Sequence, residues 1–254
     1  MTNLLLSNEC LLLLQILISF GGVILSFRLW GKTGLFAWAA FITLFANLEV
    51  NSFCTMFGLT VSLGNVAFVS LALAQDILSE NYGQNIAKKS VYIGFFAAIA
   101  VVIISWFSIH FNCPDGLNGG NHEAFCQVFG SVGAIVLASL ISYFCSNCLN
   151  VWLYAFIRKY TQRIWLRTQF STWTSQLFDS FFFTGLCISF VMLYQTTGVE
   201  WFNTQFPTGW SIYFELSITT YIIKIIVAIF EIPFSYWAKS LFKNHKINDE
   251  LNRH

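Results

Sequence analysis

Long apolar runs alternate with short polar connections along the whole chain. Most of the runs reach the roughly 20 residues that a helix needs to cross a bilayer. The alternating pattern of a membrane β-barrel is absent, so helices are the expected way to satisfy backbone hydrogen bonds in lipid. The sequence therefore predicts an all-α polytopic membrane protein with six to seven transmembrane helices in one bundle. Its seven apolar segments are about 4–27, 34–57, 59–76, 91–112, 127–157, 168–198 and 210–241.

A single transmembrane domain is expected over residues 1–254. The first run, from Leu4 to Phe27, lacks a basic start and a small-residue cleavage site, which indicates a retained helix rather than a removed signal. Residues 1–33 then form an additional N-terminal helix, and residues 243–254 form a tail.

Composition agrees with a membrane protein and narrows the possible chemistry. The 254 residues are 56% hydrophobic and only 10% charged, whereas soluble domains carry about 25% charged residues. The net charge of +1 gives no general attraction to nucleic acid. All four histidines fall at segment ends or in connections, so no metal site is expected and no cofactor is implied.

Seven cysteines are scattered along the chain. Cys145 and Cys148 have the spacing of a redox or metal motif, but they lie within one helix and lack a second pair. We interpret them as small apolar residues of the helix. Cys113 and Cys126 flank a short connection expected outside the cell, where both a disulfide and two free thiols remain open.

Lysine and arginine are confined almost entirely to alternate connections. The opposite connections, near Gly58 and at 113–126 and 199–209, contain none. Because cytoplasmic connections are rich in Lys and Arg, we expect the basic connections and the C-terminus in the cytoplasm and the N-terminus outside. Twelve of the 13 basic residues follow this rule: Arg28, Lys32, Lys88, Lys89, Arg158, Lys159, Arg163, Arg167, Lys239, Lys243, Lys246 and Arg253.

The sixth segment carries a polar face within an otherwise apolar run. A carboxylate that faced lipid would be very unfavourable, so this face must look into the protein or into water. Asp179 lies near the middle of the polar arc and is the leading candidate for a functional residue. On a helix the arc spans about 140° and contains Thr168, Ser171, Thr172, Ser175, Gln176 and Asp179.

The thirteenth basic residue, Lys224, lies deep in the last segment. A lone Lys at the bilayer centre costs about 2.5–3.5 kcal/mol, so a partner or a wet cavity is expected. Glu231 is two turns away, about 10 Å along the axis, and Asp179 of the neighbouring helix is the better partner. An ion pair that only fixes helix packing is the alternative.

Two further segments carry polar groups. The fifth has a polar stripe that includes Tyr143, Asn147 and Asn150, and the third ends with Asp76 and Glu80 one helical turn apart. Gly83 then permits a break in the helix. A solvated helix end is the alternative interpretation of this acidic pair. Glu49 of the second segment points away from its polar neighbours and has no assigned role.

Five stretches taken together resemble a known family. They are LWGKTGLFAW, NLEVNSFCTMFGLTVSLGNV, DILSENYG, WLRTQFSTWTSQLFDS and YIIKIIVAIFEIPFSY, in this order. They are similar to the VUT family, the YhhQ-like transporters of queuosine precursors, over about residues 28 to 242. The resemblance implies a bacterial inner-membrane importer of 7-deazaguanine bases and no enzymatic activity. The implied substrates are 7-cyano-7-deazaguanine, 7-aminomethyl-7-deazaguanine or queuine.

The chain departs from the family pattern at three places. Gln75 stands where Thr often precedes the aspartate, and Thr168 and Gln169 replace two Asn residues. On the fifth segment the family often shows a Ser-Gln-x-x-Asp motif, where this chain has Ser146, Asn147 and Asn150. The last change removes a carboxylate from a predicted site helix, which bears on the substrate rather than on the class.

The residues suit a guanine-like base on chemical grounds as well. One carboxylate can accept the adjacent N–H and NH2 groups of such a base, amide side chains can donate to its carbonyl, and aromatic rings can flank it. The candidate substrate-binding residues are Asp179, Gln176, Ser175, Lys224, Asn147, Asn150, Asp76, Glu80, Tyr143, Phe183 and Glu231.

Other classes of function remain to be weighed. The chain could be the substrate-binding membrane subunit of an energy-coupled vitamin or nucleobase uptake complex, since it contains no nucleotide-binding motif. An intramembrane aspartyl protease needs a second aspartate in a setting such as G-x-G-D, which the sequence lacks. Only the helix count suggests a receptor. Proton or ion coupling and a homodimer both stay open.

The distribution of basic residues predicts the orientation of the chain. In a background whose reactive natural cysteines have been replaced, Thr204→Cys should react with a membrane-impermeant maleimide in intact cells. The control Gln162→Cys, in a basic connection, should react only after the inner membrane is broken. The reverse pattern would refute this orientation.

Overall fold

The computed structural model describes residues 7–49, 52–111, 134–198 and 209–251. Cys113 and Cys126, for which a disulfide and two free thiols were both left open, lie outside these residues. The described helices are α1 (Asn8–Glu49), α2 (Asn65–Tyr82), α3 (Gln84–Ile109), α5 (Ala134–Ile157), α6 (Ile164–Thr197), α7 (Trp210–Ile229) and α8 (Glu231–Leu251).

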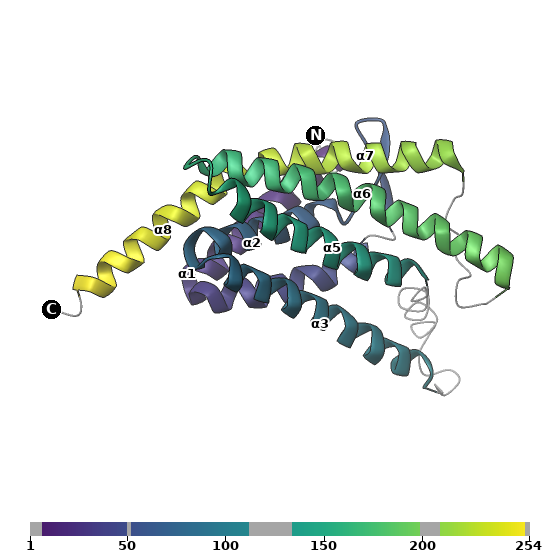
Figure 1. Cartoon of the computed structure of the whole chain (residues 1–254), viewed down its shortest axis with the longest axis horizontal. Coiled ribbons are helices and arrows are strands. Elements are labelled where there is room, and N and C mark those ends of the chain that lie inside the picture. The colour runs from purple at the N-terminus through teal and green to yellow at the C-terminus, as the bar shows by residue number, and fades with distance from the viewer. Residues whose placement is uncertain (1–6, 50–51, 112–133, 199–208, 252–254) are drawn as a thin grey trace.

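Long helices run beside one another as a bundle, and α8 projects from one end of it (Figure 1). The outer surface exposes large apolar side chains such as Ile18, Phe96 and Ile104, as a helix surface in contact with lipid requires. The polytopic α-helical architecture agrees with the sequence, whereas the number of crossings stays a prediction. Among the described residues, five helical stretches are long and apolar enough to cross a membrane: Asn8–Glu49, Gln84–Ile109, Leu137–Ile157, Ile164–Thr197 and Tyr213–Lys243.

Helix α1 folds back on itself at Gly31. This residue has φ 58° and ψ −133°, a conformation that favours glycine because it has no Cβ. The two legs lie antiparallel, since Gln15 Nε2 donates to Glu49 Oε1 over 2.9 Å and the Trp38 ring packs directly against Gly22. The first two apolar segments are therefore separate legs, as predicted, and Glu49 joins them at one end.

A β-hairpin follows α1 where the sequence predicted helix. Strands β1 (Phe53–Met56) and β2 (Leu59–Ser62) pair antiparallel, with Met56 opposite Leu59. The turn between them has positive φ at Phe57 and Gly58, as the tightest hairpin turns require. The expectation that the second segment continues to residue 57 as helix was wrong, because a short apolar run fits a strand and a helix equally by its periodicity.

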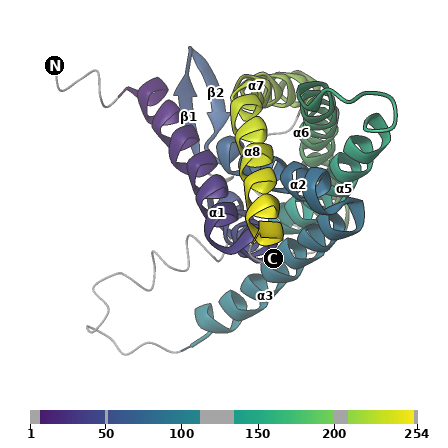
Figure 2. The same cartoon turned by 90° about the vertical axis from the view of Figure 1, so that its left-hand side faces the viewer.

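Helix α2 forms the centre of the bundle. Fourteen of its 18 residues are buried, and it contacts all six other helices. Seen from the end, those helices surround it (Figure 2). The third predicted segment is thus shifted: the helix begins at Asn65 rather than near residue 59 and ends at Tyr82. Gly83, with φ 90°, makes the predicted break before α3.

The last predicted segment is two helices and not one. Helix α7 ends at Ile229 and α8 begins at Glu231, with Phe230 between them. Pro233 accounts for the break, because its ring clashes with the carbonyl of Ile229 four residues earlier and it has no N–H to donate there. The sequence prediction passed over this proline because the apolar run continues on both sides of it.

The basic connections meet at one end of the bundle. Arg158 Nη1 donates to the Ser79 carbonyl over 2.7 Å, and Lys239 Nζ lies 3.0 Å from Glu80 Oε1. Gly31 lies against Tyr82 at the same end of α2. The fold therefore brings the basic residues near α1, α3, α5, α6 and α8 to a single side, which is the arrangement that the charge rule requires.

Gly94 sets the approach of α3 to α1 and α5. A Cβ atom at this position would collide with Tyr143 Oη and Thr43 Oγ1. We expect Gly94→Ala to destabilise the fold by about 1–3 kcal/mol through overpacking. Thermal unfolding in detergent measures the loss. Adding Tyr143→Phe, which removes the colliding hydroxyl, should restore part of it, and no rescue would contradict this packing.

Candidate functional site

The polar face of α6 is buried over its first four turns. Between Arg167 and Asp179 it rises about 18 Å, at about 1.5 Å per residue, and it meets polar side chains of α2, α5, α7 and α8 at successive levels. We call this set the polar ladder. Its members on α6 are Arg167, Thr168, Thr172, Ser175, Gln176 and Asp179, all of them at most 8% exposed.

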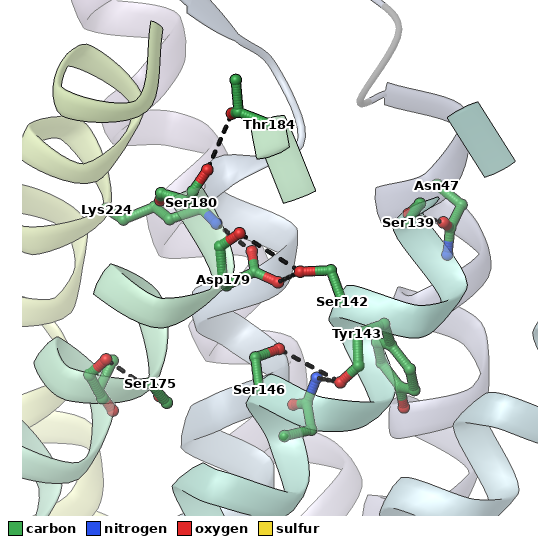
Figure 3. A network of polar contacts seen from close by, with 12 residues as sticks. Asn47, Ser139, Ser142, Tyr143, Ser146, Ser175, Asp179, Ser180, Thr184 and Lys224 are labelled. Carbon is green, nitrogen blue, oxygen red and sulfur yellow. Dashed lines mark hydrogen bonds and ion pairs between the residues drawn. The ribbon is translucent and has the colours of Figure 1, made fainter. Parts of the chain in front are cut away.

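Asp179 and Lys224 form the level of the polar ladder that lies farthest from the start of α6, which we call the upper level. Lys224 Nζ donates to Asp179 Oδ2 over 2.6 Å, and Ser142 Oγ donates to Asp179 Oδ1 over 2.7 Å (Figure 3). The ammonium group also lies 5.2 Å from the centroid of the Phe68 ring, a favourable position for a cation. The predicted ion pair is therefore formed, and both of its members are buried.

Asn150 connects two helices at the middle level. Its Nδ2 donates to Asp76 Oδ1 over 3.2 Å, and its Oδ1 accepts from Ser175 Oγ over 3.3 Å. Beside it, Gln75 Nε2 donates to Asn147 Oδ1 over 2.9 Å. The amides of α5 thus hold the buried face of α2 against α6.

Glu231 enters the polar ladder from the start of α8. Its side chain is fully buried, and its Oε2 accepts from Thr172 Oγ1 over 3.2 Å. Lys224 is paired with Asp179 at the upper level instead, as the sequence spacing predicted. The break at Phe230 thus lies between Lys224, the lysine of α7, and Glu231, the glutamate at the start of α8.

Glu80 forms the lower level with two cations. Arg167 Nη1 lies 2.6 Å from Glu80 Oε2 and Lys239 Nζ lies 3.0 Å from Oε1, while Tyr154 Oη donates over 3.1 Å. Arg167 was expected in a solvated basic connection, but it is 1% exposed because α6 begins earlier, at Ile164. The solvated helix end considered for Glu80 does not fit these contacts.

Two predicted site residues, Tyr143 and Phe183, have other surroundings, whereas Gln176 belongs to the polar ladder. Tyr143 Oη lies 3.3 Å from Thr43 Oγ1 and 3.4 Å from the Val91 carbonyl, so it faces α1 and α3. Phe183 packs against a smaller apolar cluster formed by Ala138, Cys187 and Val191. Gln176 lies at the middle level of the polar ladder and is 7% exposed.

The sequence analysis missed part of the site. Ser142 lies on the same segment as the polar stripe of Tyr143, Asn147 and Asn150 but was not chosen, and Gln75 was noticed only as a departure from the family pattern. Helical spacing was the signal for Ser142, which lies eight residues before Asn150, whereas Gln75 directly precedes Asp76 and is not at helical spacing from it. Arg167 carried no such signal, since it ends a basic run.

The polar ladder contains buried acceptor atoms without a hydrogen-bond partner among the described residues. Buried polar groups are normally paired, and an unpaired one costs about 1–3 kcal/mol. Such a surplus of acceptors suits a ligand that presents several N–H donors. The unpartnered acceptors are Gln75 Oε1, Asp76 Oδ2, Gln169 Oε1, Gln176 Oε1 and Glu231 Oε1.

Within the part of the chain that the structure describes, no group of three or more His, Cys, Asp or Glu side chains could hold a metal ion. The site is instead a column of acids, amides, hydroxyls and bases enclosed by apolar helices. The fold and this column together define a polytopic α-helical membrane protein with a buried set of polar groups.

Comparisons with known proteins give the family. The family model described as a putative vitamin uptake transporter matches residues 62–238, and the chain belongs to this family of transporters. A protein of Bacillus subtilis (strain 168), named "Probable queuosine precursor transporter", is 32% identical over 231 residues, which cover 90% of this chain and 93% of that protein. No solved structure matches the chain. Membership of a transporter family agrees with the expected non-enzymatic role.

The two cations around Glu80 should contribute very differently to stability. Arg167→Ala should destabilise the protein by about 3–5 kcal/mol, because it removes one partner of a buried ion pair. Lys239 is 49% exposed at its side chain, so Lys239→Ala should cost about 0–1 kcal/mol. Melting temperatures in detergent compare the two variants. Equal losses would mean that the burial of Arg167 has no energetic consequence.

Proposed function

We propose that this protein imports queuosine precursors, the 7-deazaguanine bases, across the bacterial inner membrane for the salvage of a tRNA modification. Its family and the printed name of its Bacillus subtilis relative support a transporter of such compounds. The candidate substrates are 7-cyano-7-deazaguanine, 7-aminomethyl-7-deazaguanine and queuine. The C-terminus is proposed to lie in the cytoplasm.

The observation that carries this proposal is the surplus of buried acceptors in the polar ladder. A 7-deazaguanine presents a ring N–H and an exocyclic NH2 on one edge and a pyrrole N–H on the other. These donors complement oxygen atoms such as Gln75 Oε1, Gln176 Oε1 and Asp76 Oδ2, which have no partner in the described structure. Satisfying them would recover part of the cost of their burial.

Asp179 is proposed as the principal contact of the base. One of its oxygen atoms binds Lys224 and the other binds Ser142. The adjacent N–H and NH2 groups of a guanine-like base can replace part of this pairing. A substrate that alters the Asp179–Lys224 pair has a different binding free energy in each of two helix arrangements. Transport requires such a difference.

The remaining proposed contacts lie at the middle level of the polar ladder. Asn147 and Asn150 are placed to orient the ring through their amides, and Ser175 is placed to orient Asn150. Glu80 and Glu231 are proposed to act below the base rather than on it. Because Tyr143 and Phe183 face other packing partners, the aromatic wall of the site is not assigned to them.

Restoration of queuosine in tRNA tests the function. A strain that lacks both its own synthesis of the bases and its own transporter would express this protein and receive each of the three bases in turn. Queuosine should reappear in tRNA with at least one of them. No restoration with any base, while the protein is present in the membrane, would overturn the proposal. Uptake by the protein alone in liposomes would exclude an obligate energy-coupled complex.

Asp179→Asn should fold, reach the membrane and bind the base about ten- to a hundred-fold more weakly. The loss of a charged hydrogen-bond partner in a buried site costs about 1.5–3 kcal/mol. Ligand-induced thermal stabilisation of the purified protein measures the affinity, with the base that restored queuosine as the ligand.

Two variants accompany this experiment. Glu49→Gln is the matched control, because Glu49 is a partly buried carboxyl group that binds Gln15 within α1 and does not belong to the polar ladder. Its affinity for the base should match that of the wild type. Lys224→Met should reach the membrane and lose uptake, since it leaves Asp179 without its cation. Equal affinity of Asp179→Asn and wild type would remove Asp179 from the site.

A further inference from the structure

Asp76 and Glu231 differ from the other buried acids of the polar ladder. Asp179 has Lys224 as its partner, and Glu80 has Arg167 and Lys239. Asp76 is 2% exposed and Glu231 is 0% exposed, yet neither has a cation partner among the described residues. Each accepts one hydrogen bond from a neutral side chain, and the second oxygen of each carboxyl group is unpartnered there.

The two carboxyl groups belong to one connected arrangement. Asn150 donates to Asp76, Ser175 Oγ lies 3.3 Å from Asn150 Oδ1 and 3.1 Å from the Thr172 carbonyl, and the Thr172 hydroxyl donates to Glu231. A short path of hydroxyl and amide groups therefore connects the acid of α2 to the acid of α8.

A second observation at this place points to a ligand. The Thr168 hydroxyl is fully buried and lies beside the Asp76 carboxyl group. The Oε1 atom of Gln75, next to Asp76 in sequence, is buried and has no hydrogen-bond partner within the described ranges. The place thus offers a hydroxyl and an unpaired acceptor near a buried carboxyl group.

Among the described residues, the buried cations of the polar ladder are bound to other acids and do not neutralise Asp76 or Glu231. From the neighbouring helices the pair is faced by Glu80 on α2, Tyr154 on α5, Arg167 and Asp179 on α6, Lys224 on α7 and Lys239 on α8. The three cations of this set are already bound to Glu80 and Asp179. The basic residues of α1 and α3 are exposed at the end of the bundle: Arg28, Lys32, Lys88 and Lys89.

Two neighbouring carboxylates cannot both stay ionised in a dry interior without a cation. Desolvation and their mutual repulsion both favour the neutral acid over the charged form. When two acids are coupled in this way, a proton belongs to the pair rather than to one residue. The amide at Asn150 donates a hydrogen bond to Asp76 and adds no third negative charge at the same place.

We propose that Asp76 and Glu231 form a proton-binding site that couples uptake of the base to inward movement of a proton. This proposal rests on the proposed function and extends it to the energy source. A proton from external water adds to a carboxylate oxygen and forms an O–H bond, and on release it returns to cytoplasmic water. The proton gradient supplies the driving force, and no other reactant is needed.

Protonation changes what the middle level of the polar ladder can bind. A neutral carboxyl group donates one hydrogen bond, whereas a carboxylate only accepts. A proton bound to the pair neutralises one buried charge. It also supplies one hydrogen-bond donor to the acceptors that have no partner among the described residues. The base and the proton therefore change the same set of contacts, which is the condition for coupling between two ligands.

Infrared spectroscopy of the purified protein tests the proton site without any substrate. The wild type at neutral pH should show the carbonyl band of a protonated carboxylic acid. The double variant Asp76→Asn/Glu231→Gln, which keeps the shape of the neutral acids, should lack this band, and Glu80→Gln should retain it. A wild type without the band, or a band that survives in the double variant, would overturn the site.

Uptake into proteoliposomes tests the coupling. With one proton per neutral base and no membrane potential, an inward gradient of about one pH unit should concentrate the base about tenfold. The double variant should equilibrate the base without concentrating it. Equal accumulation with and without the gradient, or accumulation driven only by sodium, would overturn proton coupling and leave the transport function intact. If no base enters at all, transport and coupling both fail, and the infrared result still decides the proton site.

Discussion

The structure depends on one constraint, which is that an ionised group can enter the hydrocarbon region only together with its partners. Helix α6 carries polar side chains along four successive turns, and none of them can face lipid. Each must be met by a side chain of another helix at the same depth. The packing of α2, α5, α7 and α8 around α6 follows from this requirement, and the burial of α2 is its most visible result.

The levels of the polar ladder provide partners for their buried acids in different ways. Near the basic end of the bundle, Glu80 holds two cations, one of them half-exposed. At the upper level, Asp179 and Lys224 form a pair with an additional hydroxyl donor. Between these two levels lie acids that have only neutral donors. The uncompensated acids therefore lie in the middle of the bundle, between two compensated levels, and this middle is the part that a ligand can change most.

Helical periodicity predicted the centre of this site. The polar arc of α6 and the pairing of Asp179 with Lys224 followed from spacing, because a repeat of 3.6 residues fixes which side chains share a face. The break at Gly83 followed from the conformational freedom of glycine. Arg167 was misplaced because charge alone assigned it to a connection, whereas its burial depends on the approach of Glu80 from a segment 87 residues away. No local pattern contains that contact.

The errors in the fold came from apolar runs that continue across a change of backbone. The β-hairpin at Phe53–Ser62 and the break at Phe230 lie within such runs, so composition gave no sign of them. Hydrophobicity reports that a segment is buried or faces lipid, but it does not report its backbone conformation. The turn at Phe57 and Gly58 and the ring of Pro233 were the only local signals.

The break between α7 and α8 has a mechanical consequence. A helix can be interrupted within a bundle only where its free backbone groups find other partners. Near the end of α7, the Ala228 carbonyl accepts from Gln169 Nε2 of α6 over 2.7 Å. A side chain of one helix therefore serves as the cap of another. Gln169 lies one turn from Thr172, which contacts Glu231. A rotation of α8 about Phe230 would therefore move Gln169 as well, and the break in the chain and the buried acid that follows it are mechanically coupled.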